Sequence, residues 1–215
     1  MIRVLIVDDH KLVRIGTARL LADEPGIEIV AEACSGEEAI TAVQRYEPDL
    51  VLMDVNMPGI GGLEATRRCL RVNPDLKVII VTMHDHEPFP SQFMNIGAQG
   101  YLTKGADVTE MVRAIKKVMR GQRYLSEEIA QLLALQPFAD EQTCPFTQLS
   151  GREMQIAIMV TNGIPVTEIS ESLSLSPKTV NSYRYRIFEK LDVHNDVALT
   201  KLAIKHRIID SEAVA

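Results

Sequence analysis

Residues 50–58 read LVLMDVNMP, and this stretch decides the fold. Four apolar residues in a row are typical of a strand that is buried on both faces, as strands of parallel sheets are. The run ends in Asp54, and Pro58 with Gly59 forces a turn soon after it. In an open parallel sheet, the carboxyl ends of the strands border the crevice in which ligands bind. Asp54 is therefore predicted to lie in such a crevice.

Three further apolar runs end in the same way. Residues 4–7 (VLIV) lead into Asp8 and Asp9, residues 78–81 (VIIV) lead into Thr82, and residues 100–103 (GYLT) lead into Lys104. Because these strand ends share one edge, three carboxylates, a hydroxyl and an ammonium group are expected to converge there. Confined like charges raise one another's pKa unless a cation joins them, and Mg2+ with carboxylate ligands suits that role. We therefore expect a magnesium site beside an aspartate, Asp54, that accepts a phosphoryl group.

The order of elements predicts two domains joined by a linker. Residues 1–121 alternate short apolar runs with amphipathic stretches, which indicates an α/β domain with a parallel sheet. Its strands are expected near 3–7, 27–33, 50–53, 78–81 and 99–102, and its helices near 11–22, 36–45, 61–72, 90–96 and 107–119. Residues 122–145 hold one helical stretch, 125–135, and then a polar, proline-bounded part, which we interpret as a linker. Residues 146–211 show only helical patterning and predict an all-α domain.

The composition excludes several classes of protein. At 215 residues, 46% hydrophobic and 24% charged, the chain resembles an ordinary globular protein with room for two cores. It has no apolar run of the roughly 20 residues that a membrane span requires. The three cysteines, Cys34, Cys69 and Cys144, lack metal-ligand spacing and predict free thiols in a reducing compartment. We therefore expect a cytoplasmic protein without a membrane partner.

The C-terminal segment carries the helix signals of a DNA-binding module. Ser150 and Glu153 form a capping box, and Ser176 with Pro177 opens a third helix. The net charge of −6 argues against non-specific nucleic-acid binding, but residues 178–190 are locally basic. A polar helix face can simply be solvated. Two short helices joined by a tight turn, the second rich in Lys, Arg, Asn and Tyr, favour a helix-turn-helix that reads the major groove.

The motifs of the first domain resemble those of two-component response-regulator receiver domains. They are residues 7–10 (VDDH), 52–58 (LMDVNMP), 81–82 (VT) and 100–104 (GYLTK). The resemblance implies a flavodoxin-like (CheY-like) five-stranded parallel sheet in which a sensor histidine kinase phosphorylates Asp54. It makes Asp8 or Asp9, Asp54 and the backbone carbonyl of Asn56 the Mg2+ ligands, and it gives phosphoryl contacts to Lys104 and Thr82. Tyr101 would swing inward as a switch residue, although a half-buried strand aromatic is the alternative.

Residues 149–153 (LSGRE) and 167–191 (TEISESLSLSPKTVNSYRYRIFEKL) resemble the LuxR-type helix-turn-helix of NarL/FixJ response regulators. The chain as a whole looks like the GacA/UvrY/SirA-type global regulators. That likeness implies a BarA/GacS-type hybrid kinase, promoter DNA with RNA polymerase, and small regulatory RNA genes as targets. By motif position, base contacts fall to Asn181, Ser182 and Tyr185, and phosphate contacts to Lys178, Thr179, Arg184, Arg186 and Lys190.

The two matched domains suggest a phosphorylation-controlled transcription factor. Phosphorylation of Asp54 is expected to release the helix-turn-helix domain and to promote a homodimer, since twofold proteins match paired half-sites. The last helix, expected at 196–206, offers Val197, Leu199, Leu202 and Ala203 as a dimer surface or as simple packing against the recognition helix.

Two other functions remain open from the sequence. An enzyme would use Asp54 as the nucleophile of a phosphatase, but Asn56 stands where such hydrolases need a second acid. A ligand-sensing DNA binder would never become phosphorylated. His10, His84 and His86 are interpreted as exposed loop residues because no third metal ligand accompanies them.

Overall fold

The computed structural model describes residues 1–83, 88–135, 144–206, 208 and 209. It divides into two compact units, Met1–Phe138 and Ala139–Ala215, each with its own secondary structure and core. His84 and His86 lie outside the described residues. Within the described part of the chain, no helix has the length and apolar character needed to cross a bilayer.

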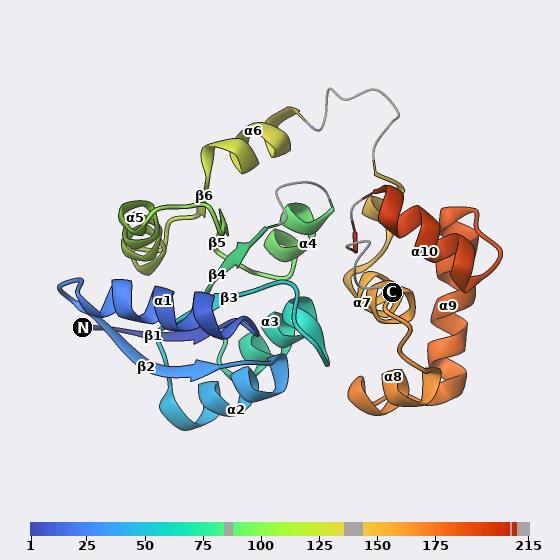
Figure 1. The fold of residues 1–215 in the computed structure, drawn as a ribbon, viewed down its shortest axis with the longest axis horizontal. Coiled ribbons are helices and arrows are strands. Elements are labelled where there is room, and N and C mark those ends of the chain that lie inside the picture. The colour runs from blue at the N-terminus through green and yellow to red at the C-terminus, as the bar shows by residue number, and fades with distance from the viewer. Residues whose placement is uncertain (84–87, 136–143, 207, 210–215) are drawn as a thin grey trace. The chain divides into compact units, whose positions relative to one another are not determined.

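The first unit is built on a parallel sheet of six strands in the order β2-β1-β3-β4-β5-β6 (Figure 1). The strands are β1 (Ile2–Val7), β2 (Ile27–Ala33), β3 (Leu50–Met53), β4 (Lys77–Thr82), β5 (Gly100–Thr103) and β6 (Tyr124–Leu125). The helices are α1 (Lys11–Ala22), α2 (Gly36–Tyr46), α3 (Gly61–Val72), α4 (Phe89–Asn95), α5 (Val108–Met119) and α6 (Glu127–Leu135). The predicted class, a flavodoxin-like parallel sheet with crossover helices, is confirmed.

The central strands of the sheet are buried on both faces, as the apolar runs predict. All four residues of β3 are at most 2% exposed, because helices cover both sides of the strand. Helices α1 and α5 pack against each other, and α2 packs against α3 (Figure 1). Ser35 and Asp107 cap α2 and α5 by accepting hydrogen bonds from the N–H groups of Glu38 and Glu110.

The sixth strand is an addition to the five that the sequence predicts. It lies within the expected linker and pairs in parallel with β5, the strand that carries Tyr101. The Tyr124 N–H donates to Gln99 O at 2.9 Å, and the Ser126 N–H donates to Tyr101 O at 3.1 Å. The expected helical stretch follows at once as α6, whose Ile129 is fully buried. The chain directly after α5 is therefore bonded to the sheet.

The second unit is helical, as predicted. Its elements are a short 3-10 turn, η2 (Pro145–Gln148), and helices α7 (Gly151–Thr161), α8 (Val166–Ser172), α9 (Pro177–Leu191) and α10 (Asp196–Lys205). The predicted capping box of Ser150 and Glu153 is present at the start of α7. Ser176 caps α9 through the Thr179 N–H, with Pro177 in the first turn.

Helix α10 has one buried face and one exposed face. Leu199 and Ala203 are fully buried, whereas Val197 is 65% exposed. The buried pair belongs to the core that α10 shares with α7. Of the four residues expected at a dimer surface, two therefore pack inside the unit, and Val197 stays available at the surface.

Candidate functional sites

The predicted carboxylates converge at the carboxyl ends of β1 and β3. Asp8 follows β1 and Asp54 follows β3, and they are 5% and 2% exposed. The Asp54 N–H donates to Val7 O at 2.9 Å, which holds the two strand ends together. Ligand-capable atoms of Asp8, Asp9, His10 and Asp54 all lie within 4.8 Å of one another. These four residues therefore form a compact acidic cluster, the acidic pocket of the first unit.

Lys104 reaches this cluster from the end of β5. Its Nζ lies 2.8 Å from Asp54 Oδ2 and 2.7 Å from Asp8 Oδ2. Burial of the ammonium group opposes its charge, but the bonds to Asp54 and Asp8 outweigh this effect and raise the Lys104 pKa. The lysine is thus a fixed cation between the two buried carboxylates.

Asp54 is held at the bottom of the pocket by its own chain. Its Oδ1 accepts a hydrogen bond of 2.7 Å from the Val55 N–H. Burial raises the pKa of Asp54 to about 6, although Lys104 pulls in the opposite direction. The start of α3 approaches closely: a Cβ at Gly62 would meet Asp54 O at 2.0 Å, so only glycine fits there. Packing thereby fixes one carboxylate oxygen, Oδ1, on the backbone and leaves Oδ2 with Lys104.

The donor set fits a hard divalent cation. Asp9 Oδ1 lies 2.9 Å from His10 Nδ1 but accepts no well-directed hydrogen bond from the described residues. Coordination to a cation would satisfy an oxygen that its neighbours satisfy only in part. Three carboxylates within reach of one point are the ligands that Mg2+ prefers. The residues present therefore suit Mg2+.

His10 and Arg14 surround the acidic cluster and were not given a role by the sequence. His10 is 66% exposed, yet its Nδ1 lies 2.9 Å from Asp9 Oδ1 and its N–H donates to Asp8 Oδ1 at 2.8 Å. Arg14 Nη1 donates to the Asp8 carbonyl at 2.6 Å. These contacts fix the turn after β1. The motif VDDH, which ends in His10, was the only signal in the sequence that pointed to this residue.

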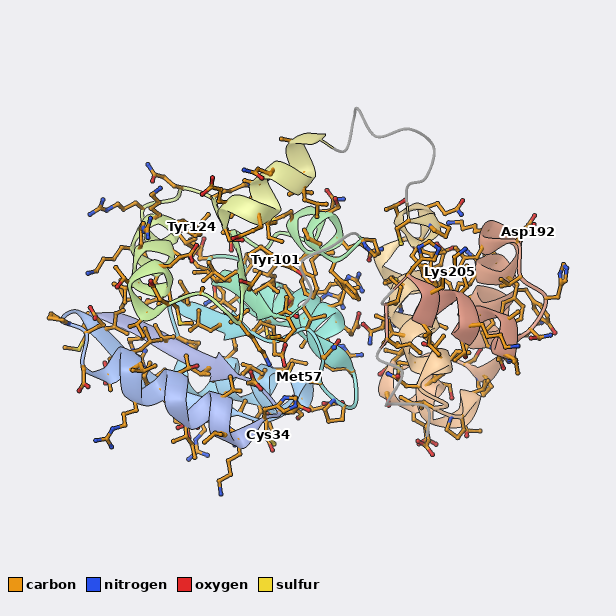
Figure 2. All side chains as sticks on the ribbon, turned by 45° about the horizontal axis from the view of Figure 1, so that its top comes forward. Cys34, Met57, Tyr101, Tyr124, Asp192 and Lys205 are labelled. Atoms are coloured by element: carbon orange, nitrogen blue, oxygen red, sulfur yellow. The ribbon has the colours of Figure 1, made fainter. Side chains whose placement is uncertain are left out.

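Thr82 and Tyr101 occupy neighbouring strands near the pocket. Thr82 ends β4 and is 1% exposed, and its carbonyl accepts from the Lys104 N–H at 2.8 Å. Tyr101 is fully buried, with its ring edge-on to Phe93 at a centroid distance of 6.3 Å. Figure 2 labels Tyr101 within the first unit. The tyrosine therefore holds an inward position, and its movement with Thr82 stays a prediction.

The loop after β3 is tied to α2. Asn56 is exposed and follows Asp54 by two residues, where its carbonyl was expected to face a metal ion. Glu37 in the first turn of α2 accepts a hydrogen bond of 3.1 Å from the Ile60 N–H. Glu37 thus restrains the loop that carries Asn56. Sequence spacing gave no signal for this contact, because 23 residues separate the two groups.

The expected DNA-contacting residues of α9 fall into two groups. Lys178, Ser182, Tyr185, Arg186 and Lys190 are exposed, Tyr185 to 72%, and Ser182 Oγ donates to Lys178 O. Four of the eight have side-chain partners within the second unit, the exposed Lys190 among them. Thr179 Oγ1 shares a hydrogen bond with Ser176, Asn181 bonds Arg184, Arg184 pairs with Asp196, and Lys190 pairs with Glu153. The exposed group forms a polar face that suits a nucleic-acid surface.

A parallel α/β unit with this acidic pocket, followed by a helix-turn-helix unit, defines a class of regulator. The sequence profile of the response regulator receiver domain matches residues 4–116, and that of bacterial regulatory proteins of the luxR family matches residues 147–203. The chain therefore belongs to the two-component response regulators with a LuxR-type DNA-binding domain.

Individual relatives share this organisation over their full length. The chain is 55% identical to the response regulator GacA of Pseudomonas aeruginosa over 98% of this chain and 99% of the relative. It is 53% identical to the response regulator UvrY of Escherichia coli K12, over 100% and 99% of the two chains. A structure of RcsB from Salmonella enterica serovar Typhimurium, bound to promoter rprA with the phosphomimetic BeF3-, matches with a TM-score of 0.72. The identity is 25% over 94% of this chain and 98% of that one.

These matches assign the general activity. The protein is a response regulator that receives phosphoryl groups from a sensor kinase and binds promoter DNA to regulate transcription. Like its relatives, it is a transcription factor and not an enzyme.

Proposed function

We propose that Asp54 is the phosphoryl acceptor through which this regulator controls promoter binding. One observation carries the proposal: a nearly fully buried carboxylate lies 2.8 Å from the Lys104 ammonium, beside two further carboxylates. Such a group is too confined to serve as surface charge. A tetrahedral dianion added to Oδ2 would instead find an ammonium group and a hydroxyl side chain nearby.

The chain's own residues prepare the acceptor oxygen. The Val55 N–H holds Oδ1, which leaves Oδ2 as the oxygen that attacks phosphorus. The bond that breaks is the P–N bond of a kinase phosphohistidine, or the P–O bond of acetyl phosphate, and the leaving group departs with that electron pair. Lys104 exchanges a carboxylate partner for a phosphoryl oxygen, to which it donates a charge-assisted hydrogen bond. Thr82 donates its hydroxyl to another phosphoryl oxygen. Most of the rate then comes from positioning and electrostatics.

Asp8, Asp9, Asp54 and the carbonyl of Asn56 would hold Mg2+. When bound, this ion offsets the charge between the carboxylate and the incoming phosphoryl group. The gathering of the three carboxylates within 4.8 Å of one another supports this assignment.

The output follows from the two-unit organisation. Phosphorylation releases the helix-turn-helix unit and promotes a homodimer that contacts paired half-sites. Base contacts come from Asn181, Ser182 and Tyr185, and phosphate contacts from the exposed cations Lys178 and Arg186. We further propose that the phosphate donor is a BarA/GacS-type hybrid kinase. The regulator acts in the cytoplasm, where it meets RNA polymerase at promoters of small regulatory RNA genes.

Labelling with acetyl phosphate and Mg2+ tests the acceptor. We expect about one phosphoryl group per chain in the wild type and none in Asp54→Asn. Asp75→Asn, which changes an exposed carboxylate in the turn before β4, is the matched control and should label like the wild type. Labelling that persists in Asp54→Asn contradicts the proposal, and so does continuous phosphate release without a stable adduct.

A further inference from the structure

Arg184 links the recognition helix α9 to α10. Its Nη1 donates to Asn181 Oδ1 at 2.8 Å, one turn earlier on α9. Its Nη2 donates to Asp196 Oδ2 at 2.5 Å, in the first turn of α10. The guanidinium also lies 5.8 Å from the centre of the Phe188 ring. Both terminal nitrogens of the guanidinium, Nη1 and Nη2, thus donate to side chains of the same unit.

These contacts make Arg184 a poor phosphate ligand. Its side chain is 22% exposed, and the Asp196 carboxylate neutralises its charge. A DNA phosphate would have to displace that carboxylate or accept its repulsion. Affinity gained from phosphate contacts requires cations that release counterions, and a neutral pair releases few. Arg186 differs, because it is exposed and its guanidinium covers the Tyr183 ring at 4.8 Å. Its charge is available to a DNA phosphate.

The same contacts determine how Asn181 presents its amide. Nη1 is a donor only, so the side chain of Asn181 must turn its oxygen toward Arg184. A flipped amide would place two donors against each other. One lone pair of Oδ1 is therefore taken, and the two N–H donors of Nδ2 remain for another acceptor.

We infer that Arg184 is a positioning residue for base recognition, which fixes the Asn181 amide so that its N–H donors face the DNA. This inference rests on the proposed function, because it requires that α9 enters the major groove. Asn181 then selects a base edge that offers an acceptor, such as N7 of a purine. Arg184 contributes to sequence preference and not to phosphate affinity.

The first arm of the test measures salt dependence. The probe is a duplex that the full-length wild type, treated with acetyl phosphate and Mg2+, selects from DNA with a randomised core. Arg184→Met keeps an apolar stem and removes the donors; its log Kd should depend on log salt as the wild type's does. The control Arg186→Met should flatten the slope by about 0.9, the value for one phosphate contact. Asp196→Asn leaves the bond to Asn181 but frees the charge of Arg184, and it should steepen the slope.

The second arm measures base preference with single-base-pair variants of that duplex. Arg184→Met and Asn181→Ala should each lose about tenfold discrimination at the same base pair. The double variant should lose no more than either single variant, because both remove one interaction. Circular dichroism confirms that each variant is folded.

Two results overturn the inference. One is a slope that Arg184→Met flattens as much as Arg186→Met does, with the base preference intact. The other is additive loss in the double variant. A wild type that selects no sequence from the pool contradicts the proposed function itself, which is a separate outcome.

Discussion

The receiver pocket and the helix-turn-helix unit both hold cations against carboxylates, but in different ways. In the pocket, Lys104 lies between Asp8 and Asp54 at an edge where ligands bind. In the second unit, Lys190 pairs with Glu153 at 2.7 Å, where the carboxylate also completes a helix cap. One carboxylate partner of Lys104 is the proposed acceptor, and Glu153 has no such role.

This difference separates a replaceable ion pair from a structural one. A phosphoryl group on Asp54 would offer Lys104 a stronger anion in place of the carboxylate, so the pair can change partner without losing a bond. Glu153 cannot be replaced in that way, because its Oε2 also accepts from the Ser150 N–H at 2.8 Å. Removing the ammonium group of Lys104 should therefore affect signalling, and removing the carboxylate of Glu153 should affect stability.

Outside the acceptor itself, Lys104→Ala should have the largest effect on signalling. Labelling of Asp54 should persist, but the gain in DNA affinity on phosphorylation should fall at least tenfold, because charge-assisted hydrogen bonds contribute about 1.5–3 kcal/mol each. Fluorescence anisotropy with labelled duplex, with and without acetyl phosphate, measures this gain. Lys116→Ala on the exposed side of α5 is the control. An undiminished gain in Lys104→Ala would show that the ammonium group does not transmit the signal.

Glu153→Gln should lower the stability of the second unit by about 1–2 kcal/mol. Burial alone would raise the pKa of Glu153, but Lys190 and the Ser150 hydrogen bonds outweigh it and lower the pKa. A lowered folded-state pKa stabilises the protein above the unfolded value, about 4.3, and this contribution disappears as the pH falls through the folded value.

Thermal unfolding of full-length wild type and Glu153→Gln at pH 6, 4 and 3 measures this contribution. The wild type should unfold at a higher temperature at pH 6, and the difference should shrink below about pH 4.3. An advantage of the wild type that is independent of pH would mean that the charge of Glu153 contributes nothing.

Ser126→Pro should have the smallest effect, on the coupling between the pocket and the linker. Proline removes the N–H that donates to Tyr101 O, at a cost of about 1 kcal/mol. We expect the phosphorylation-dependent gain in DNA affinity to fall several-fold while labelling stays normal. Ser126→Ala keeps this N–H and removes only a hydroxyl that has no partner among the described residues. Equal behaviour of the two variants would show that β6 does not carry the signal.

Much of the receiver pocket follows from the sequence. Apolar runs that end in Asp8, Asp54 and Lys104 must bring these groups together once the strands are parallel, since the sheet edge is shared. Strand β6 could not be found in this way. Its two residues, Tyr124 and Leu125, show no periodicity, and only the pairing with β5 makes them a strand.

The second unit was predictable in its helices and caps but not in its ion pairs. Ser150, Glu153 and Ser176 are local signals that act within one turn. The pairing of Arg184 with Asp196 joins two helices across 12 residues, and the sequence alone cannot distinguish such a cation from a solvated one. A basic helix face therefore predicts a nucleic-acid surface better than it predicts which cations contact phosphates.

The central claim is that modification of one buried carboxylate, Asp54, controls DNA affinity. Its most direct test is the dissociation constant for the selected duplex, measured for wild type and Asp54→Asn with and without acetyl phosphate and Mg2+. The donor should tighten binding of the wild type at least tenfold and leave that of Asp54→Asn unchanged. An equal response of the two proteins to the phosphodonor would contradict the claim.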